Sequence, residues 1–235
     1  MMDSLRTVAV AIFAKTPGLT PAKTRLAIGA GHATADAFYR RALDVTEAVA
    51  CAAMTADAAL VPYWAVAERK AIGRTCWSGF PQLWQGDGDL GARLARVYEC
   101  LLEQHAAVLL IGTDSPLLLP RHLVRAHEAL VNDDRDFVMG RALDGGFYLL
   151  GGRAPMARTM WTTVSYSESS TADQLLAKLE AVGSVGQLPP LPDVDTLEDL
   201  LAIPALAAES RELLPSQRSL VEWIGTRTRD RPGVA

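Results

Sequence analysis

Continuous apolar runs alternate with amphipathic stretches along most of this chain. Residues 7–14 (TVAVAIFA) and 107–112 (AVLLIG) are unbroken apolar runs rich in β-branched residues, a pattern typical of strands buried on both faces of a parallel sheet. In the first half of the chain the same reasoning predicts a strand at 58–66, a short apolar segment at 80–85, and helices at 34–54 and 90–104.

The second half continues the alternation and adds a departure from it. Two strands, at 137–140 and 146–150, are expected on either side of the turn Leu143-Asp144-Gly145-Gly146. The other elements expected here are helices at 120–131, 171–182 and 196–203, with Thr196 as the cap of the last, and a short strand from 186 to 188. The pattern therefore predicts an α/β fold with a doubly wound, mostly parallel sheet and a small β excursion.

Composition agrees with a globular protein and limits the kinds of partner it binds. The 235 residues are 49% hydrophobic and 21% charged, with a net charge of −4, which favours one well-packed domain. The acidic balance argues against a nucleic-acid or anionic-membrane surface, because such surfaces need clustered basic residues. A small anionic ligand needs only a local basic pocket.

Two further features bear on compartment and redox chemistry. The run at 7–14 is too short to span a membrane and lacks a signal-peptide cleavage pattern, so a cytoplasmic protein is expected. Cys51, Cys76 and Cys100 show no CxxC spacing, so neither a disulfide framework nor a zinc site is indicated, and they are expected to be buried small apolar residues.

The residues that follow the strands carry the candidate chemistry, because ligands of open α/β sheets bind beyond the carboxyl ends of the strands. The first apolar run leads into a loop with three cations, Lys15, Lys23 and Arg25, beside proline and glycine. Lysine and arginine in such a loop suit a phosphate cradle. A solvated surface loop is the alternative reading.

The second apolar run ends in Gly-Thr-Asp114-Ser-Pro. A carboxylate at this place could hold Mg²⁺, which prefers one or two carboxylates together with substrate phosphate oxygens. The second acidic ligand could be Asp144 or belong to the pair Asp193 and Asp195. Taken alone, Asp114 could equally be a turn residue.

Other motifs give less support. Residues 86–91 (GDGDLG) match GxGxxG, but the two aspartates would repel a pyrophosphate, and the preceding strand is short and not the first of the chain. A dinucleotide-dependent oxidoreductase is therefore a distant alternative. His122 and His127 are five residues apart on a predicted helix, which places them on different faces and argues against a shared metal.

Five stretches, in this order along the chain, resemble the bacterial DUF2064 family. They are FAKTPGLTPAKTRLA, QGDGDLGARL, LLIGTDSPLL, ALDGGFYLLGG and DVDTLEDL, running from Phe13 to about residue 200. Members are described as glycosyltransferase-like or nucleotide-diphospho-sugar transferase-like proteins with a GT-A fold, a superfamily that includes sugar-phosphate nucleotidylyltransferases. The resemblance implies a single GT-A-like, Rossmann-like domain over residues 1–204 and a C-terminal helical extension with a loose tail over 205–235.

The resemblance also implies roles for individual residues. Lys15, Lys23 and Arg25 would hold the donor phosphates, with Lys23 and Arg25 also counted with Asp114 as catalytic. Other roles it implies are nucleobase contacts for Gln85 and Gly91, metal ligation for Asp114 and Asp195, and an acceptor side made by Asp144, Gly145 and Gly146. Two places depart from the family pattern: residues 19–22 (LTPA) precede the KTRL motif, and Tyr166-Ser167 replaces a tryptophan-serine pair.

The expected function is a transferase dependent on Mg²⁺ or Mn²⁺ that uses a nucleotide or nucleotide-sugar donor and a small-molecule acceptor. Glycosyl and nucleotidyl transfer both fit the motifs, because in each the cations and the metal neutralise charge on a phosphate leaving group. The alternative, motivated by the two departures and by a single clear carboxylate after the central strand, is a non-catalytic nucleotide-binding module of the same fold.

Overall fold

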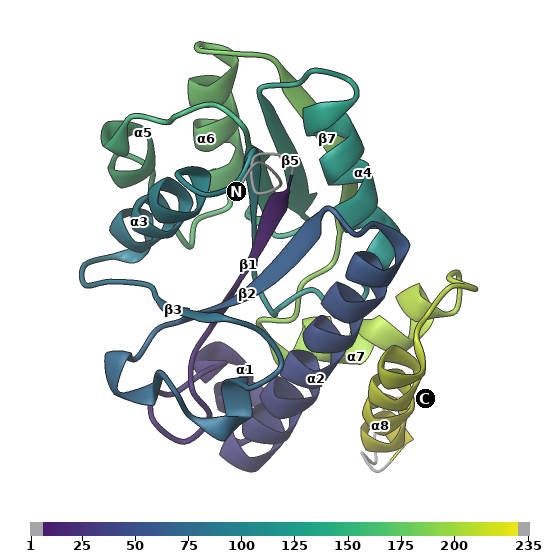
Figure 1. The fold of residues 1–235 in the computed structure, drawn as a ribbon. Coiled ribbons are helices and arrows are strands. Elements are labelled where there is room, and N and C mark those ends of the chain that lie inside the picture. Colours follow the sequence, from purple (N-terminus) through teal and green to yellow (C-terminus); the bar gives the residue numbers. More distant parts are fainter. Residues whose placement is uncertain (1–6, 230–235) are drawn as a thin grey trace.

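A seven-stranded, mostly parallel sheet forms the centre of the protein (Figure 1). The computed structural model describes residues 7–229. The strands are β1 (Val8–Ala14), β2 (Leu60–Val66), β3 (Gln82–Trp84), β4 (Ala107–Ile111), β5 (Phe137–Ala142), β6 (Phe147–Gly152) and β7 (Val185–Leu191), in the order β3-β2-β1-β4-β6-β5-β7. Strand β6 pairs antiparallel with both β4 and β5, whereas every other pairing in the described sheet is parallel.

Helices cover both faces of the sheet (Figure 1). They are α1 (Thr24–Ala30), α2 (His32–Ala56), α3 (Leu90–Leu102), α4 (Pro120–Val131), α5 (Arg158–Thr162), α6 (Thr171–Glu180), α7 (Leu197–Ala207) and α8 (Pro215–Arg229), with 3₁₀ turns at Arg69–Ala71 and Thr75–Trp77. Phe38, Leu123 and Ile224 belong to the core between the sheet and α2, α4 and α8. On the other face, Leu94, Trp161 and Leu175 belong to the core beneath α3, α5 and α6.

The hydrophobic pattern predicted this architecture. Both unbroken apolar runs are central strands, β1 and β4, with no exposed residue, and the β excursion is the antiparallel strand β6. Strand β7 continues through Pro189 and Pro190, which an edge strand tolerates because one side of its backbone needs no ladder partner. The short helices α1 and α5 were not predicted, because five to seven residues are too few to establish a helical period.

The strand order creates a crevice at one edge of the sheet. The chain leaves β1 toward β2 on one side, and β4 is the parallel neighbour of β1 on the other side, so the strand order reverses direction between β1 and β4. This reversal of direction is the place where α/β sheets bind ligands. Each candidate residue that follows β1 or β4 is therefore carried to the same opening.

The expectation for the cysteines was wrong. Cys51, Cys76 and Cys100 are all free and exposed. Cys51 and Cys100 lie on the outward faces of α2 and α3, and Cys76 lies in a surface 3₁₀ turn. The preference of cysteine for burial is a tendency of the residue type, and the helical position of each residue overrides it here.

The membrane and the C-terminal tail are the subjects of two further expectations. Among residues 7–229, none of the helices combines the length and apolar character needed to cross a bilayer. The tail expected to be loose begins at Arg227, inside α8, and from residue 230 onward it lies outside the described residues.

Candidate functional site

A pocket of about 600 Å³ opens at the carboxyl ends of the central strands. It gathers most of the residues predicted from the sequence: Lys15, Lys23, Arg25, Gln85, Asp114, Asp144, Gly146 and Asp195. Their positions in the chain span more than 170 residues, and they meet because parallel strands end at one edge of the sheet. Gly91 and Gly145 lie close by but do not line the pocket.

The loop after β1 is fixed at its start by the side chains of Tyr39, Glu68 and Trp77. The hydroxyl of Tyr39 accepts a hydrogen bond from the Lys15 amide at 2.8 Å and donates one to the Lys15 carbonyl at 2.9 Å. Glu68 accepts from the Thr16 amide at 2.8 Å, and the indole of Trp77 donates to the Thr16 hydroxyl at 3.3 Å. The backbone that carries Lys15 therefore has a defined position before any ligand arrives.

Glu68 is ionised in this arrangement. Burial acts to raise the pKa of its carboxyl, but hydrogen bonds from Thr20 and Thr16 outweigh burial and lower the pKa. The charged form is the better acceptor, which strengthens its hold on the loop.

Lys23 occupies the centre of the polar network. Its backbone is left-handed, with φ 53° and ψ 42°, which is uncommon for a residue with a side chain and concentrates at functional sites. Its ammonium contacts Asp114 Oδ1 at 2.8 Å, Asp195 Oδ1 at 3.0 Å and the Val194 carbonyl at 2.5 Å. Only 4% of the side chain is exposed, so all three donors of this ammonium are directed to protein acceptors.

The charge of Lys23 is stabilised by its two acidic partners. Burial acts to lower its pKa, but Asp114 and Asp195 together raise it above the usual value. The ammonium thus bridges Asp114 and Asp195, the two carboxylates that the family resemblance implies as metal ligands. That ligand pair stays a prediction, as does the contact of Lys23 with donor phosphates.

The other two cations of the loop are more accessible. Arg25 is 63% exposed and contacts Asp195 at 3.2 Å, an exposed ion pair that is easily exchanged for another anion. The Lys15 ammonium is exposed and donates only to the Pro21 carbonyl, at 3.3 Å. Lys15 and Arg25 are therefore the loop cations most open to a phosphate.

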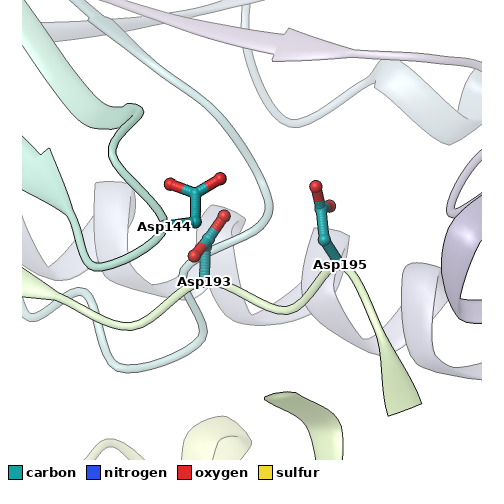
Figure 2. A group of neighbouring side chains, drawn as sticks. All are labelled: Asp144, Asp193 and Asp195. Atoms are coloured by element: carbon teal, nitrogen blue, oxygen red, sulfur yellow. The ribbon is translucent and has the colours of Figure 1, made fainter. Parts of the chain in front are cut away.

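Three carboxylates lie close together in the same pocket, those of Asp144, Asp193 and Asp195 (Figure 2). Oxygens of Asp144, Asp193 and Asp195 all lie within 4.8 Å of one another. Asp144 comes from the turn between β5 and β6, and the other two from the segment after β7. Burial, together with the charges of Asp144 and Asp195, raises the pKa of Asp193 to about 7. A full negative charge on Asp193 is therefore unfavourable at neutral pH, and a bound cation would favour it.

The turn that presents Asp144 depends on glycine. Gly145 has φ 94°, and a Cβ at this position would lie 1.9 Å from the Ser169 carbonyl oxygen. Asp144 in turn accepts a hydrogen bond from the Gly146 amide at 2.8 Å. Both glycines assigned to the acceptor side thus shape the backbone that holds the Asp144 carboxylate in place.

The donor set of these three aspartates fits a divalent cation. Mg²⁺ and Mn²⁺ are hard ions that take carboxylate oxygens as ligands. The sequence offered Asp144 and the pair Asp193 and Asp195 as alternative sources of a second acidic ligand beside Asp114, and it did not group the three together. Their juxtaposition could not be read from the chain, because the segments are about 50 residues apart and meet only through the pairing of β5 with β7.

The segment assigned to the nucleobase divides into two parts. Gln85 is buried and lines the pocket, and its amide nitrogen donates to the Ala65 carbonyl at 2.8 Å. Its amide oxygen is then the group suited to a ligand. Gly91 instead lies against α5, where a Cβ would be 2.6 Å from the Trp161 carbonyl oxygen. The nucleobase contacts of both residues stay predictions.

The fold is shared with solved structures of nucleotide-using transferases. A proposed nucleotide-diphospho-sugar transferase from Desulfovibrio desulfuricans G20 aligns with a TM-score of 0.81 at 23% identity, over 94% of this chain and 96% of that chain. A 4-diphosphocytidyl-2C-methyl-D-erythritol synthase from Anaerococcus prevotii aligns at 0.53 with 11% identity, over 87% and 99%. A CMP:2-keto-3-deoxy-manno-octonic acid synthetase complexed with CTP aligns at 0.50 with 15% identity, over 86% and 99%.

These likenesses define the class: the protein has the GT-A-like α/β fold of nucleotide-diphospho-sugar transferases. The chain belongs to the family DUF2064, described as "uncharacterized protein conserved in bacteria", whose sequence profile matches residues 44–168, more than half of the chain. No curated protein sequence matches it significantly.

Proposed function

We propose that this protein transfers a glycosyl or nucleotidyl group from a nucleotide donor to a small acceptor, with Mg²⁺ or Mn²⁺ bound by Asp144, Asp193 and Asp195. The observation that carries the proposal is the meeting of these carboxylates with Lys15 and Arg25 in one pocket. The pocket lies where this fold binds its ligands. A divalent cation held there by carboxylates would also bind the negative phosphate oxygens of the donor.

Each group of the site has a defined task in such a reaction. Lys15 and Arg25 would bind the donor phosphates and neutralise the charge that develops on the leaving diphosphate or pyrophosphate. A bound divalent cation supplies Lewis-acid stabilisation of the same charge. Lys23 keeps Asp114 and Asp195 at fixed positions, so the site needs little rearrangement when the donor binds.

The acceptor would approach from the side of the Asp144 turn. A carboxylate there can accept a hydrogen bond from an acceptor hydroxyl and orient it toward the donor. The same geometry serves glycosyl and nucleotidyl transfer, and the two differ in which bond of the donor breaks. The identity of the released nucleotide product separates them.

Ligand-induced stabilisation tests the proposal. We expect at least one nucleoside triphosphate or nucleotide sugar to raise the melting temperature, and to raise it more with Mg²⁺ or Mn²⁺ than without. Saturation at 100 times the Kd corresponds to about 2.7 kcal/mol. A donor that is a triphosphate and yields pyrophosphate indicates nucleotidyl transfer, and a nucleotide sugar that yields a nucleoside diphosphate indicates glycosyl transfer.

The variant Asp193→Asn identifies the metal site. It should weaken divalent-ion binding about tenfold or more, by analogy with the loss of a charged ligand interaction, while the protein stays folded because one repelling charge is removed. Asp36→Asn, at an exposed position of α2, is the matched control and should bind metal like the wild type. If no nucleotide stabilises the wild type with or without metal, the proposal fails. Metal-dependent binding without turnover across a broad acceptor panel would support the non-catalytic module instead.

A further inference from the structure

The cations of the pocket come from two opposite walls. Lys15, Lys23 and Arg25 belong to the β1–α1 connection, on the face of the sheet covered by α2 and α4. Arg93 belongs to α3, on the opposite face, and lines the same pocket together with Leu90, on the preceding turn of that helix. The family motif QGDGDLGARL contains Arg93, but no role in the site has been assigned to it so far.

One edge of the Arg93 guanidinium is held by a hydrogen bond to the backbone. Its Nε donates to the Gly88 carbonyl at 2.9 Å. Gly88 has φ 100°, a conformation that favours glycine, and the next residue, Asp89, caps α3 by accepting from the Ala92 amide at 2.8 Å. The loop thus holds one edge of the guanidinium and leaves its two terminal nitrogens for another partner.

Arg93 differs from Lys23 and Arg25 in having no carboxylate partner within the described part of the chain. Lys23 and Arg25 both contact carboxylates. Among residues 7–229, Arg93 has no carboxylate within 4.0 Å, although Glu168 lines the same pocket. An arginine whose fork is held from behind and unpaired in front is suited to a bidentate anion such as a carboxylate or a phosphate.

The surroundings of Arg93 strengthen such a contact. Leu90, Leu94, Phe147 and Tyr166 line the pocket with it, and the Tyr166 hydroxyl is already engaged with the Trp161 carbonyl at 3.0 Å. Arg93 itself is half-buried, which reduces screening by water, so an ion pair there is worth more than at an open surface. The three aspartates proposed to hold the metal come from other segments, the β5–β6 turn and the chain after β7.

We infer that Arg93 binds an anionic group, a carboxylate or a phosphate, on the acceptor substrate. This inference rests on the proposed function, since it takes the wall of Lys15 and Arg25 as the donor side, and it gives α3 to the acceptor in place of the predicted contact of Gly91 with the nucleobase. The acceptor class is then a small anionic molecule that carries a hydroxyl, such as a sugar phosphate or a hydroxy acid. The pocket therefore has two anion-binding positions, one for the donor and one for the acceptor.

Calorimetry with inorganic phosphate tests the second position. Phosphate is titrated into protein already saturated with Mg²⁺ and the nucleoside diphosphate that stabilises it most, so that the donor position is filled. We expect wild-type protein to bind phosphate, Arg93→Met to bind it about 10- to 100-fold more weakly, and Arg93→Lys to fall between them, because lysine keeps the charge but not the fork. A parallel titration with acetate separates carboxylate from phosphate preference.

Arg96→Met is the matched control. Arg96 lies one turn further along α3, with its Cζ 5.7 Å from the centroid of the Trp84 ring, and it does not line the pocket. The variant Arg96→Met therefore removes the same charge from the same helix and should leave phosphate binding unchanged. Nucleotide affinity should be equal in all four proteins.

Three results would overturn the inference. They are an Arg93→Met protein that binds phosphate like the wild type, a wild type that binds neither anion beside the nucleotide, and an Arg93→Met protein that loses nucleotide affinity, which would place Arg93 on the donor. Failure of the proposed function is seen separately, because in that case no nucleotide binds the wild type at the first step, and both proposals fall.

Discussion

Two buried basic residues, Lys23 and His122, have their protonation fixed in opposite directions by their neighbours. The acidic partners of Lys23 raise its pKa against the effect of burial. For His122, burial and the charges of Arg121 and Arg125 together lower the pKa to about 4, against the opposing charge of Glu212. His122 is therefore neutral at neutral pH, and its Nδ1 accepts a hydrogen bond from the Leu119 amide at 2.9 Å.

This hydrogen bond predicts a stability loss in acid. Leu119 precedes α4 and has no side-chain acceptor, so His122 supplies the one that a glutamate or glutamine provides in a capping box. Because the folded pKa lies below the unfolded value of 6.5, the stabilisation is complete above pH 6.5 and is lost as pH falls toward 4. We expect up to about 3 kcal/mol of unfolding free energy to be lost in this window.

Urea unfolding at several pH values between 7 and 4 measures this loss. His122→Gln keeps an acceptor at the same helix position without titrating there, and so should show a smaller decrease than the wild type. Equal decreases in the two proteins would mean that other groups cause the acid sensitivity. The two histidines of α4 do act separately, as the sequence indicated: His127 pairs with Asp57 instead.

At the scale of elements, α3 positions one wall of the pocket through its packing on α5. Gly91 allows this close approach, since a Cβ there would meet the Trp161 carbonyl oxygen at 2.6 Å and Tyr166 at 2.9 Å. The ring of Trp161 in turn packs against Tyr98, with centroids 5.3 Å apart. Gly91, the last glycine of the QGDGDLG motif, is thus needed for packing, whatever contact it makes with a nucleobase.

Substitution of glycines should therefore have opposite effects at two helical positions. Gly91→Ala should destabilise the protein by about 1–3 kcal/mol, because backbone lies in the way and a helix must shift. Gly225→Ala, in α8, adds a Cβ that meets nothing within 4 Å and should stabilise by up to about 1 kcal/mol through helix propensity. Thermal and urea unfolding of the two variants compare them directly. A neutral Gly91→Ala would show that α3 can move away from α5 at little cost.

At the scale of the whole molecule, the C-terminal helix is joined to the candidate site. Gln217 of α8 is fully buried, and its amide nitrogen donates to the carbonyls of Pro116 and Leu118 at 2.8 and 2.9 Å. These carbonyls belong to the segment that follows Asp114. Helix α8 also packs on α2, where Arg41 lies over the Trp223 ring at 4.6 Å. The division into residues 1–204 and 205–235 stays a prediction, and residue 204 lies within α7.

Loss of the Gln217 side chain should affect both stability and ligand binding. Gln217→Ala leaves two buried carbonyls and the Leu214 amide without their partner, which should cost about 2–4 kcal/mol. It should also weaken metal-dependent nucleotide binding, since the displaced loop carries Asp114, which pairs with Lys23. Glu222→Ala, at an exposed position of the same helix, is expected to change stability by less than about 0.5 kcal/mol. Nucleotide binding unchanged in Gln217→Ala would show that the helix stabilises the fold without positioning the site.

The sequence by itself determined the fold class and brought several of the pocket-lining residues together. Apolar runs marked the central strands, helical periods marked the long helices, and the strand-end rule brought Lys15, Gln85 and Asp114 to one edge of the sheet. These features are local or follow from general topology, so they survive without coordinates. The burial of the cysteines was mispredicted for the opposite reason, because the orientation of a helix toward solvent is decided by its neighbours.

Only the tertiary structure decided which charges pair. It placed the Lys23 ammonium between Asp114 and Asp195, grouped Asp193 with Asp144 and Asp195, and set Arg93 on the facing wall. A difference of a few ångströms determines whether a carboxylate neutralises a lysine or is available to a metal ion. Such distances depend on strand pairing and loop packing between residues up to 172 positions apart, which no local sequence pattern encodes.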